Sequence, residues 1–485
     1  MAYSPLRSRR RACTRSHSWS RPLLVLAALL LGAPSAARAN GAYSHVHISQ
    51  LAVSELPPGP IRTLLEDPLY APMYEAGSMF PDSGYAISSP YGEEAHWPPF
   101  VRAYQEYLME TYQGDFSSSE AKEQLAFFLG FASHGVADQT YDTMMLARSE
   151  EIDGPVGDVD READYFIIID QNVLLYTESW APYEPLPSIF SDSVMYGSNP
   201  AVSTIDQATI ENGMGRMGFV IFIQRRAAYN GYLQAWNTYP WLGTHIYNPD
   251  AHGSLPHLAK LVAASWQALY RRVQGVASMD TDLVVATVPE DGETNFPVDP
   301  AESRTLTQLG VVFGYGIKRD QLSPLIRLVD ESGETVPTTF HTPYNTSIAF
   351  FAMLRPTGQL QYDHQYRVEV SAGVENLAGE TSSVPYTYTF RTRCAPDALA
   401  DCPPLPPPLV TGPIPTAPPP LTGTDAGVDA GTTEPEVDMG VSPSPSGGGG
   451  CSVVAARAGS TALLPLLLVA LVGLARRRRV PRTPV

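Results

Sequence analysis

The fold of this 485-residue chain is decided by Leu125-Ala-Phe-Phe-Leu-Gly-Phe-Ala-Ser-His-Gly-Val-Ala-Asp-Gln-Thr-Tyr-Asp142. His134 and Asp138 lie four residues apart in this apolar stretch, so on a helix both project from one face into the interior. Buried polar groups need partners, and a metal ion satisfies a neutral imidazole and a carboxylate together. Asp142 lies one further turn along the same helix face. Taken alone, such a pair is more often an ordinary hydrogen bond than a ligand set, so the rest of the chain must decide.

The region around this stretch reads as helical. Aromatic residues and long connections run from Asn40 to about Gly275, and three helices are readable. One covers residues 98–112, with two prolines in its first turn; one follows the capping box Ser117-x-x-Glu120 and carries His134; one is the amphipathic segment 255–273. The sequence therefore predicts an all-α domain over residues 40–278.

A second domain follows, with a different composition. Short β-prone runs separated by Gly, Pro, Asp and Asn occupy residues 284–288, 309–313, 326–329, 348–354, 366–370 and 386–391, which predicts a β-sandwich over residues 280–395. The segments Asn295-Phe-Pro-Val-Asp299, Leu328-Val-Asp-Glu-Ser-Gly333 and Gly373-Val-Glu-Asn-Leu-Ala-Gly379 resemble bacterial Ig-like domains. That resemblance implies a spacer role.

The two ends of the chain read as export and anchoring segments. Residues 1–39 have an arginine-rich start, an apolar run and Ala37-Arg38-Ala39 before Asn40, as in a cleaved signal peptide. Residues 403–450 are rich in Pro, Thr and Gly and predict a disordered stalk. In residues 451–485 a glycine run, Cys451, a short hydrophobic helix and four arginines resemble the myxobacterial C-terminal sorting tag. We therefore expect a protein held on the cell surface or outer membrane of a bacterium. Cys451 would be recognised by the export and sorting machinery.

The net charge and the positions of the cysteines further restrict the classes of function that the sequence allows. Residues 1–39 contain seven arginines and residues 452–485 contain six, which leaves 19 basic against 50 acidic side chains in residues 40–451, a net charge of −31. Binding nucleic acid depends on Lys and Arg neutralising phosphates, so nucleic acid is not an expected partner. Cys394 and Cys402 close a short loop in an exported protein, where a disulfide is the default interpretation.

Further metal-ligating side chains precede His134 in the chain. His45 lies five residues after Asn40, whose α-amino group becomes available if the signal peptide is cleaved. Asp82 follows Pro81 in what reads as a turn, and His96 falls just before a helix N-terminus, where the helix dipole favours the neutral, ligating imidazole.

The order His45, Asp82, His96, His134, Asp138 resembles the zinc-dependent phospholipase C family, and within it the catalytic domain of glycosylphosphatidylinositol-specific phospholipase D. The resemblance implies an all-α domain with a zinc cluster that activates a water molecule. It implies one zinc ion on Asn40 and His45, a second on Asp82, His96 and His134, Asp138 bridging both, and Asp82 also acting as general base.

A third family metal site departs from the pattern. Where relatives carry histidines, this chain has Asp142 and Asp160, followed by Asp164. Oxygen ligands suit a harder divalent ion than Zn²⁺, and the alternative is that this third site is lost.

The sequence thus predicts a surface phosphodiesterase that hydrolyses phospholipids or lipid-linked headgroups by a metal-activated water at a membrane surface. Two alternatives remain: a catalytically inactive adhesin that metal only stabilises, and a single-strand nuclease-like enzyme, which the charge disfavours.

Overall fold

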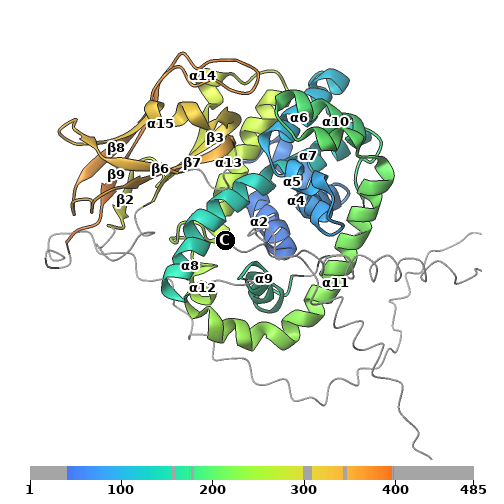
Figure 1. The fold of residues 1–485 in the computed structure, drawn as a ribbon, viewed down its shortest axis with the longest axis horizontal. Coiled ribbons are helices and arrows are strands. Elements are labelled where there is room, and N and C mark those ends of the chain that lie inside the picture. The colour runs from blue at the N-terminus through green and yellow to red at the C-terminus, as the bar shows by residue number, and fades with distance from the viewer. Residues whose placement is uncertain are drawn as a thin grey trace, which may run out of the picture. The chain divides into compact units, whose positions relative to one another are not determined.

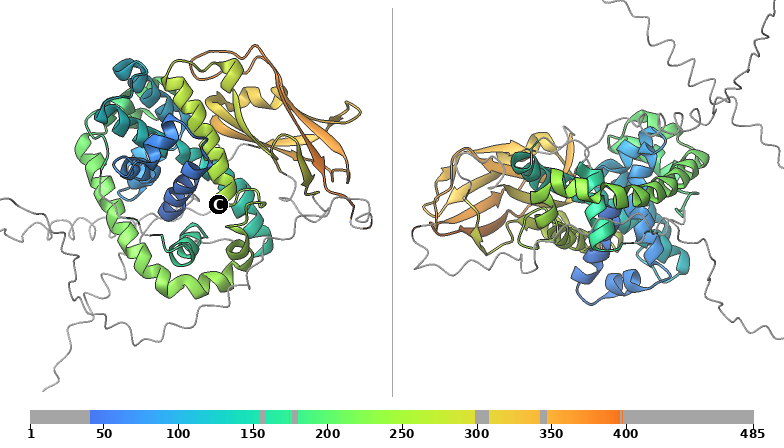
Figure 2. Two further views of the ribbon diagram at one scale, coloured as in Figure 1. Left: turned by 180° about the vertical axis from the view of Figure 1, so that it is seen from behind. Right: turned by 90° about the horizontal axis from the view of Figure 1, so that it is seen from below.

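The computed structural model describes residues 41–154, 159–173, 175, 180–298, 308–341, 347–395 and 397. These residues fall in one compact unit, with the helices first in the chain and the strands last (Figures 1 and 2). The expected signal peptide, linker and C-terminal segment lie outside the described residues, as do Asn40, Cys402 and Cys451. In the part that the structure describes, no helix is long and apolar enough to cross a membrane.

The N-terminal domain is helical, as expected. Its helices are α2 (Ala42–Glu55), α3 (Pro60–Glu66), α4 (Ala71–Tyr85), α5 (Pro90–Ala95), α6 (Pro98–Tyr112), α7 (Ser119–Thr140), the π-helix η1 (Tyr141–Leu146), α8 (Ala147–Ile152), α9 (Val159–Asp170), α10 (Leu186–Ser193), the 3₁₀ turns η2 (Val194–Tyr196) and η3 (Pro200–Thr204), α11 (Gln207–Thr238), α12 (Pro240–His245) and α13 (Leu255–Val273).

Local sequence explains where the best-predicted helices begin. Helices α6 and α13 have the bounds read from the sequence, with prolines in their first turns. The cap of α7 differs from the expectation: Ser118, not Ser117, accepts the hydrogen bond from the Ala121 backbone N–H. Ser117 instead donates its backbone N–H to Asp115.

Asp82 is also placed differently from the expectation. It lies inside helix α4, which continues through Pro81, and not in a turn. Proline removes one backbone hydrogen bond and usually breaks a helix. Here Phe80 is fully buried beside Phe127 and Phe131, and this aromatic packing holds the helix on both sides of the proline.

Helices α4 and α7 pack closely because each has a glycine at the crossing. A Cβ atom on Gly77 would overlap the Phe127 carbonyl, and one on Gly130 would overlap the Tyr74 carbonyl. Two ordinary side chains would force the helices apart. The crossing brings the C-terminal half of α4 beside the C-terminal half of α7.

The C-terminal domain is a two-sheet β-sandwich. One sheet has the order β1 (Val284–Val288), β3 (Leu309–Lys318), β7 (Ile348–Pro356), β6 (Thr338–His341); the other has the order β2 (Glu293–Phe296), β9 (Tyr386–Thr392), β8 (Gln365–Val370), β4 (Ile326–Asp330), β5 (Thr335–Val336). Helix α14 (Met279–Asp282) precedes β1, and the 3₁₀ turn η4 (Arg319–Gln321) with helix α15 (Leu322–Leu325) joins β3 of one sheet to β4 of the other. All six predicted strands are present, and only the pair β2 and β9 is parallel among the described pairs.

The sandwich shares a core with the helices. Val288, Val312, Phe350, Phe351 and Met353 belong to the buried cluster that the helical residues form. The buried guanidinium of Arg272 on α13 stacks on the Tyr315 ring of β3 at 4.0 Å and donates to Gln105 of α6. The sandwich therefore packs on the helical domain, and the spacer role that the resemblance implies stays a prediction.

Candidate metal centre

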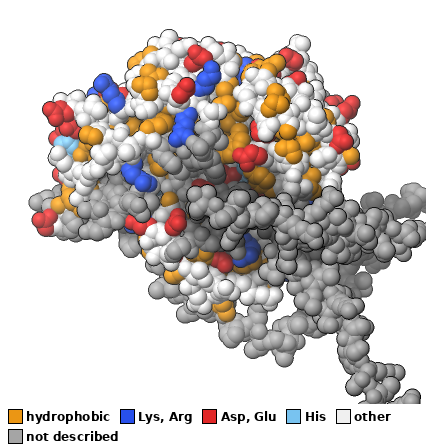
Figure 3. All heavy atoms as spheres, viewed as in Figure 1, with side chains coloured by type: hydrophobic (Ala, Val, Ile, Leu, Met, Phe, Trp, Pro, Cys, Tyr) orange, Lys and Arg blue, Asp and Glu red, His pale blue; other side chains and the backbone are white. Residues whose placement is uncertain are grey.

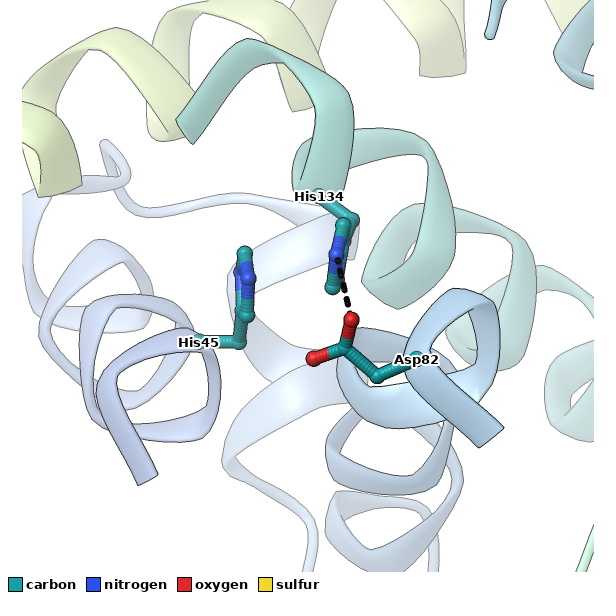
Figure 4. Close-up of side chains that lie close together, drawn as sticks. All are labelled: His45, Asp82 and His134. Carbon is teal, nitrogen blue, oxygen red and sulfur yellow. Dashed lines mark ion pairs between the residues drawn. The ribbon is translucent and has the colours of Figure 1, made fainter. Parts of the chain in front are cut away.

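Four helical segments bring five predicted ligands to one place. His45 lies on α2, Asp82 on α4, and His134 and Asp138 on α7, while His96 is the C-cap residue of α5. Figure 4 shows His45, Asp82 and His134 pointing toward one another from their three helices. The side chains of the other four residues are at most 3% exposed, and that of Asp82 is 15% exposed. Asp82 is therefore the ligand candidate that meets solvent.

The polar atoms converge at short distances. His45 Nε2 lies 3.0 Å from Asp138 Oδ1, and His134 Nε2 lies 3.4 Å from Asp138 Oδ2. Asp82 Oδ1 lies 3.7 Å from both His96 Nε2 and His134 Nε2. The rings of His45 and His134 stack with their centroids 3.4 Å apart. Two overlapping triads, His45 with Asp82 and His134, and His96 with His134 and Asp138, have the spacing that one metal ion requires.

The orientation of two imidazoles favours a cation between them. His134 Nδ1 lies 2.7 Å from the Ser78 carbonyl oxygen, and His96 Nδ1 lies near the Gly92 carbonyl oxygen, so in both rings Nδ1–H donates to the backbone. Their Nε2 atoms then face each other across 3.0 Å. Two lone pairs at this distance repel unless a positive charge lies beside them. Backbone carbonyls that fix the ring tautomer in this way are typical of metal-binding histidines.

Burial and charge shift the pKa values of these groups in opposite directions. Burial would raise the pKa of the Asp138 carboxyl, but His134 and His45 outweigh it and hold that pKa well below its ordinary range. For Asp82 the opposing effect of His134, His96 and His45 likewise wins over burial, so its pKa is lowered. Both carboxylates are therefore ionised.

The histidines differ from one another. Burial lowers the pKa of His134, helped by the neighbouring His45. For His96 burial also opposes the charged form, yet Asp82 and Asp138 raise its pKa above the ordinary 6.5. His96 therefore binds a second proton more tightly than His134 does.

The donor set fits zinc. Three imidazole nitrogens and two carboxylates are the usual zinc ligands in catalytic sites. His45 Nε2 is buried and makes no hydrogen bond, although it lies against Asp138. A metal ion would satisfy it.

Neither Asp142 nor Asp164 belongs to the two described triads. Asp142 lies in η1, two residues after the end of α7, and the side chain of Asp160 lies outside the described residues. Asp164 on α9 is fully buried and accepts hydrogen bonds from the backbone N–H groups of Tyr43 and Ser44, at 3.2 Å and 2.8 Å. A role of these aspartates in binding a harder cation stays a prediction.

Sequence reasoning missed what Asp164 does to helix α2. Its carboxylate also accepts from the Ser44 hydroxyl and from Gln224 of α11, so it satisfies the first N–H groups of α2. Burial raises the pKa of Asp164 to about 6, against these hydrogen bonds. No sequence motif indicates this contact, because it joins residues about 120 positions apart.

Cys394, predicted to form a disulfide, is buried and disulfide-bonded. Its expected partner Cys402 lies outside the described residues.

Comparisons with known proteins agree with the two domains. Residues 280–392 match the bacterial Ig-like domain model. A Dictyostelium discoideum phosphatidylinositol-glycan-specific phospholipase D is 43% identical over 68 residues, which are 14% of this chain and 7% of that protein. Its Bos taurus counterpart is 34% identical over 77 residues, which are 15% of this chain and 9% of that protein. The chain thus spans less than a tenth of each relative.

Among solved structures, domains 1–6 of the surface layer protein SbsC align over 60% of this chain and 45% of that one, at 9% identity. The TM-score of 0.18 is too low to support any conclusion. Residues 44–141, which contain all five clustered candidate ligands, match the model of the zinc dependent phospholipase C family.

Proposed function

We propose that this protein is a zinc-dependent phosphodiesterase that hydrolyses phospholipids or lipid-linked headgroups. The observation that carries the proposal is the pair of Nε2 atoms of His96 and His134, fixed 3.0 Å apart by backbone carbonyls and surrounded by Asp82, Asp138 and His45. The family match and the two phospholipase D relatives support a phosphodiester of a lipid as the substrate class.

The proposed site holds two zinc ions, as the sequence predicts. His96 and His134 with Asp82 would hold one ion and His45 with the Asn40 amine the other. Asp138, which has one oxygen near His45 and the other near His134, would be a ligand of both. When bound, zinc supplies Lewis acidity toward a phosphoryl oxygen and makes water a stronger acid.

The chain's own groups then have distinct tasks. Asp138 is ionised and buried, so it neutralises positive charge and fixes the distance between the two halves of the site. Asp82 is ionised and reaches solvent, so it orients the attacking water and accepts its proton. The Ser78 and Gly92 carbonyls hold the imidazoles rigidly during the reaction.

Hydrolysis adds water across one P–O bond. In C-type cleavage the bond to the diacylglycerol oxygen breaks, and the phosphorylated headgroup carries the new oxygen. In D-type cleavage the bond to the headgroup oxygen breaks, and phosphatidate remains. Analysis of both product classes tells which bond is cut.

The test measures metal and product with the whole chain. Purified protein should contain zinc and should release a phosphorylated headgroup or phosphatidate from phosphatidylcholine or phosphatidylinositol. Asp82→Asn should lower the rate by about a hundredfold or more, because it removes the proton acceptor and one proposed zinc ligand while leaving the four buried ligands in place. Asp192→Asn changes an exposed carboxylate of α10 outside the cluster and is the matched control.

Three results would contradict the proposal. Zinc without hydrolysis of either lipid would favour the inactive, metal-stabilised adhesin. Cleavage of single-stranded DNA in preference to lipid would favour the nuclease-like alternative. Equal rates for Asp82→Asn and Asp192→Asn would remove Asp82 from the mechanism.

We propose in addition that the protein is exported and held at a bacterial cell surface by its C-terminal segment, with sorting at Cys451. The support is the sequence pattern of residues 1–39 and 451–485. Fractionation of cells that express the whole chain, compared with a Cys451→Ser variant, tests it: the variant should leave the membrane fraction, and an unchanged distribution would oppose sorting through this cysteine.

A further inference from the structure

Helix α11 exposes an apolar face that its own packing does not need. Phe219 is 55% exposed, Phe222 61% and Tyr229 46%. Leu233 continues the same face one turn later. These residues follow one another at spacings of three, seven and four, so they form a stripe on one side of the helix. Figures 1 and 2 show α11 as a long curved helix on the outside of the helical domain.

The opposite side of α11 already provides its contribution to the core. Ile210, Met214, Met217, Ile221, Ala228, Tyr232 and Ala235 are buried. Between the two sides, Phe219-Val-Ile-Phe-Ile223 is apolar all round. A helix that is apolar all round is normally covered on every side, and adjacent exposed aromatic residues mark an interaction surface more often than isolated ones do.

The same face carries unpaired positive charge. After Glu211, helix α11 contains Arg216, Arg225 and Arg226 and no acidic residue. Arg216 and Arg226 are exposed, and neither forms an ion pair among the residues that the structure describes.

Several other basic side chains of the chain face carboxylates, as Arg62 faces Glu66 and Arg102 faces Glu106. Acidic side chains are scattered over the face drawn in Figure 3, as the net charge of the chain requires. The arginines of α11 are thus a local positive region on an acidic protein.

The inner side of α11 touches the start of the metal centre. The Tyr43 hydroxyl donates to the Ile221 carbonyl at 3.4 Å. Gln224 donates to Asp164, which in turn accepts from the backbone of Ser44, the residue before His45. Phe219 and Phe222 therefore lie on the stretch of α11 whose inner side contacts the first turn of α2.

The arginines and aromatic residues of this face indicate which kind of partner it binds. An isologous contact between two copies would place arginines against arginines, and α11 has no carboxylate between Arg216 and Leu233 to pair with them. Aromatic side chains beside arginines on a helix too polar to cross a bilayer are typical of a helix that lies in the membrane interface. Anionic headgroups supply the missing negative charge.

We propose that the outer face of α11, formed by Arg216, Phe219, Phe222, Arg226, Tyr229 and Leu233, docks the protein on a lipid surface that contains anionic lipids. The proposal rests on the proposed function and deepens it, because it names the surface that presents the metal centre to a lipid interface. The aromatic rings enter the interface, and the arginines contact phosphate groups.

The test is co-sedimentation of the whole chain with vesicles of phosphatidylcholine alone and of phosphatidylcholine mixed with phosphatidylglycerol. The wild type should bind the mixed vesicles more strongly, and salt should reduce the difference. The double variant Phe219→Ser with Phe222→Ser should bind both vesicle types more weakly than the wild type, by a factor of about ten or more. The double variant Arg216→Gln with Arg226→Gln should lose the preference for phosphatidylglycerol.

Matched controls change the same residue kinds elsewhere. Leu69→Ser removes an exposed apolar side chain outside this face, 58% exposed, and Arg62→Gln removes an exposed arginine that is paired. Both should bind vesicles like the wild type. Zinc content and the unfolding temperature of every variant show whether the fold is kept.

Hydrolysis of a monomeric short-chain phospholipid separates this inference from the proposed function. Face variants should keep the wild-type rate on the monomeric substrate and lose rate only on vesicles. Vesicle binding by a wild type that cleaves neither substrate would support docking and contradict the phosphodiesterase. Equal vesicle binding by the wild type and the phenylalanine variant would overturn the proposed docking face. So would a dimeric wild type whose face variants become monomers while vesicle binding stays unchanged.

Discussion

The imidazoles of His96 and His134 show how single residues prepare the metal centre. Each ring holds one proton against a backbone carbonyl, of Gly92 and of Ser78, and turns its other nitrogen inward. Without a metal ion, the two Nε2 atoms can face each other only if one ring carries a second proton, and the buried Asp138 carboxylate stays ionised beside them. Zinc binding replaces that proton and should stabilise the fold.

The first prediction concerns pH. The pKa of His96 is raised above 6.5, so without metal its proton contributes stability that is complete below pH 6.5 and is lost as pH rises through the raised pKa. Zinc must displace this proton, so its affinity should fall as pH falls. The increase in unfolding temperature on adding zinc should be smallest near about pH 5.5 and largest near about pH 8, measured by scanning calorimetry against a chelated sample. An increase that shrinks with rising pH would contradict this order.

The second prediction concerns Asp164. Asp164→Ala leaves the buried N–H groups of Tyr43 and Ser44 without their acceptor, which should lower the free energy of unfolding by about 2–4 kcal/mol. Zinc affinity should fall as well, because His45 lies on the turn that these bonds hold. Asp206→Ala is the control: it removes an exposed N-cap of α11 and should cost about 1 kcal/mol with no change in zinc. Equal zinc affinity in both variants would show that Asp164 only stabilises α2.

At the scale of elements, the crossing of α4 and α7 decides whether the ligands meet. Asp82 lies beyond Gly77 on α4, and His134 and Asp138 lie beyond Gly130 on α7. The bond from His134 to the Ser78 carbonyl spans the same crossing. A shift of either helix would therefore separate the ligands and break the bond that orients an imidazole.

The third prediction tests this crossing. Gly130→Ala would place a methyl group against the Tyr74 carbonyl and should destabilise the protein by about 1–3 kcal/mol while lowering zinc occupancy. Gly215→Ala, in α11 with open space around it, should instead stabilise the protein by up to about 1 kcal/mol through helix propensity. Urea unfolding of both variants measures the change in the free energy of unfolding, and metal analysis measures zinc occupancy. A Gly130→Ala protein as stable as Gly215→Ala would mean that the crossing tolerates a wider separation.

Helices α6 and α13 could be predicted to the residue, whereas α11 could not be predicted. The first two combine prolines at the start with a regular apolar stripe. In α11 the run Phe219-Val-Ile-Phe-Ile223 is apolar on both sides, so the period of the stripe is lost. The strands β2, β5 and β6 escaped prediction because they are short and only partly buried or lie at sheet edges.

At the scale of the whole molecule, helices and sandwich share one core. Phe351 of β7 is fully buried in the cluster that the helices form, and Phe350 lies near Gly135, one residue after His134. Strand β7 therefore supports the helix that carries two ligands. This contact couples the stability of the sandwich to the metal centre.

The fourth prediction follows from that coupling. Phe351→Ala should cost about 3–5 kcal/mol, and helices and strands should still unfold in one transition when followed by circular dichroism. Val384→Ala, at an exposed position of the sandwich, should change stability little. Two separate transitions, with the zinc-dependent one unaffected by Phe351→Ala, would show that the domains are independent.

The sequence by itself determined the types, order and spacing of the candidate metal ligands and the bounds of helices such as α6 and α13. Residue type, spacing and the order of His45, Asp82, His96, His134 and Asp138 are local properties of the chain, and the match over residues 44–141 agrees with the family that they indicate. Only the tertiary structure decided that Asp164 caps α2, that Pro81 lies inside a helix, that the sandwich supports α7 and that α11 has an outer face. The physical reason is distance along the chain: these features depend on contacts between residues far apart in sequence, which no local pattern encodes.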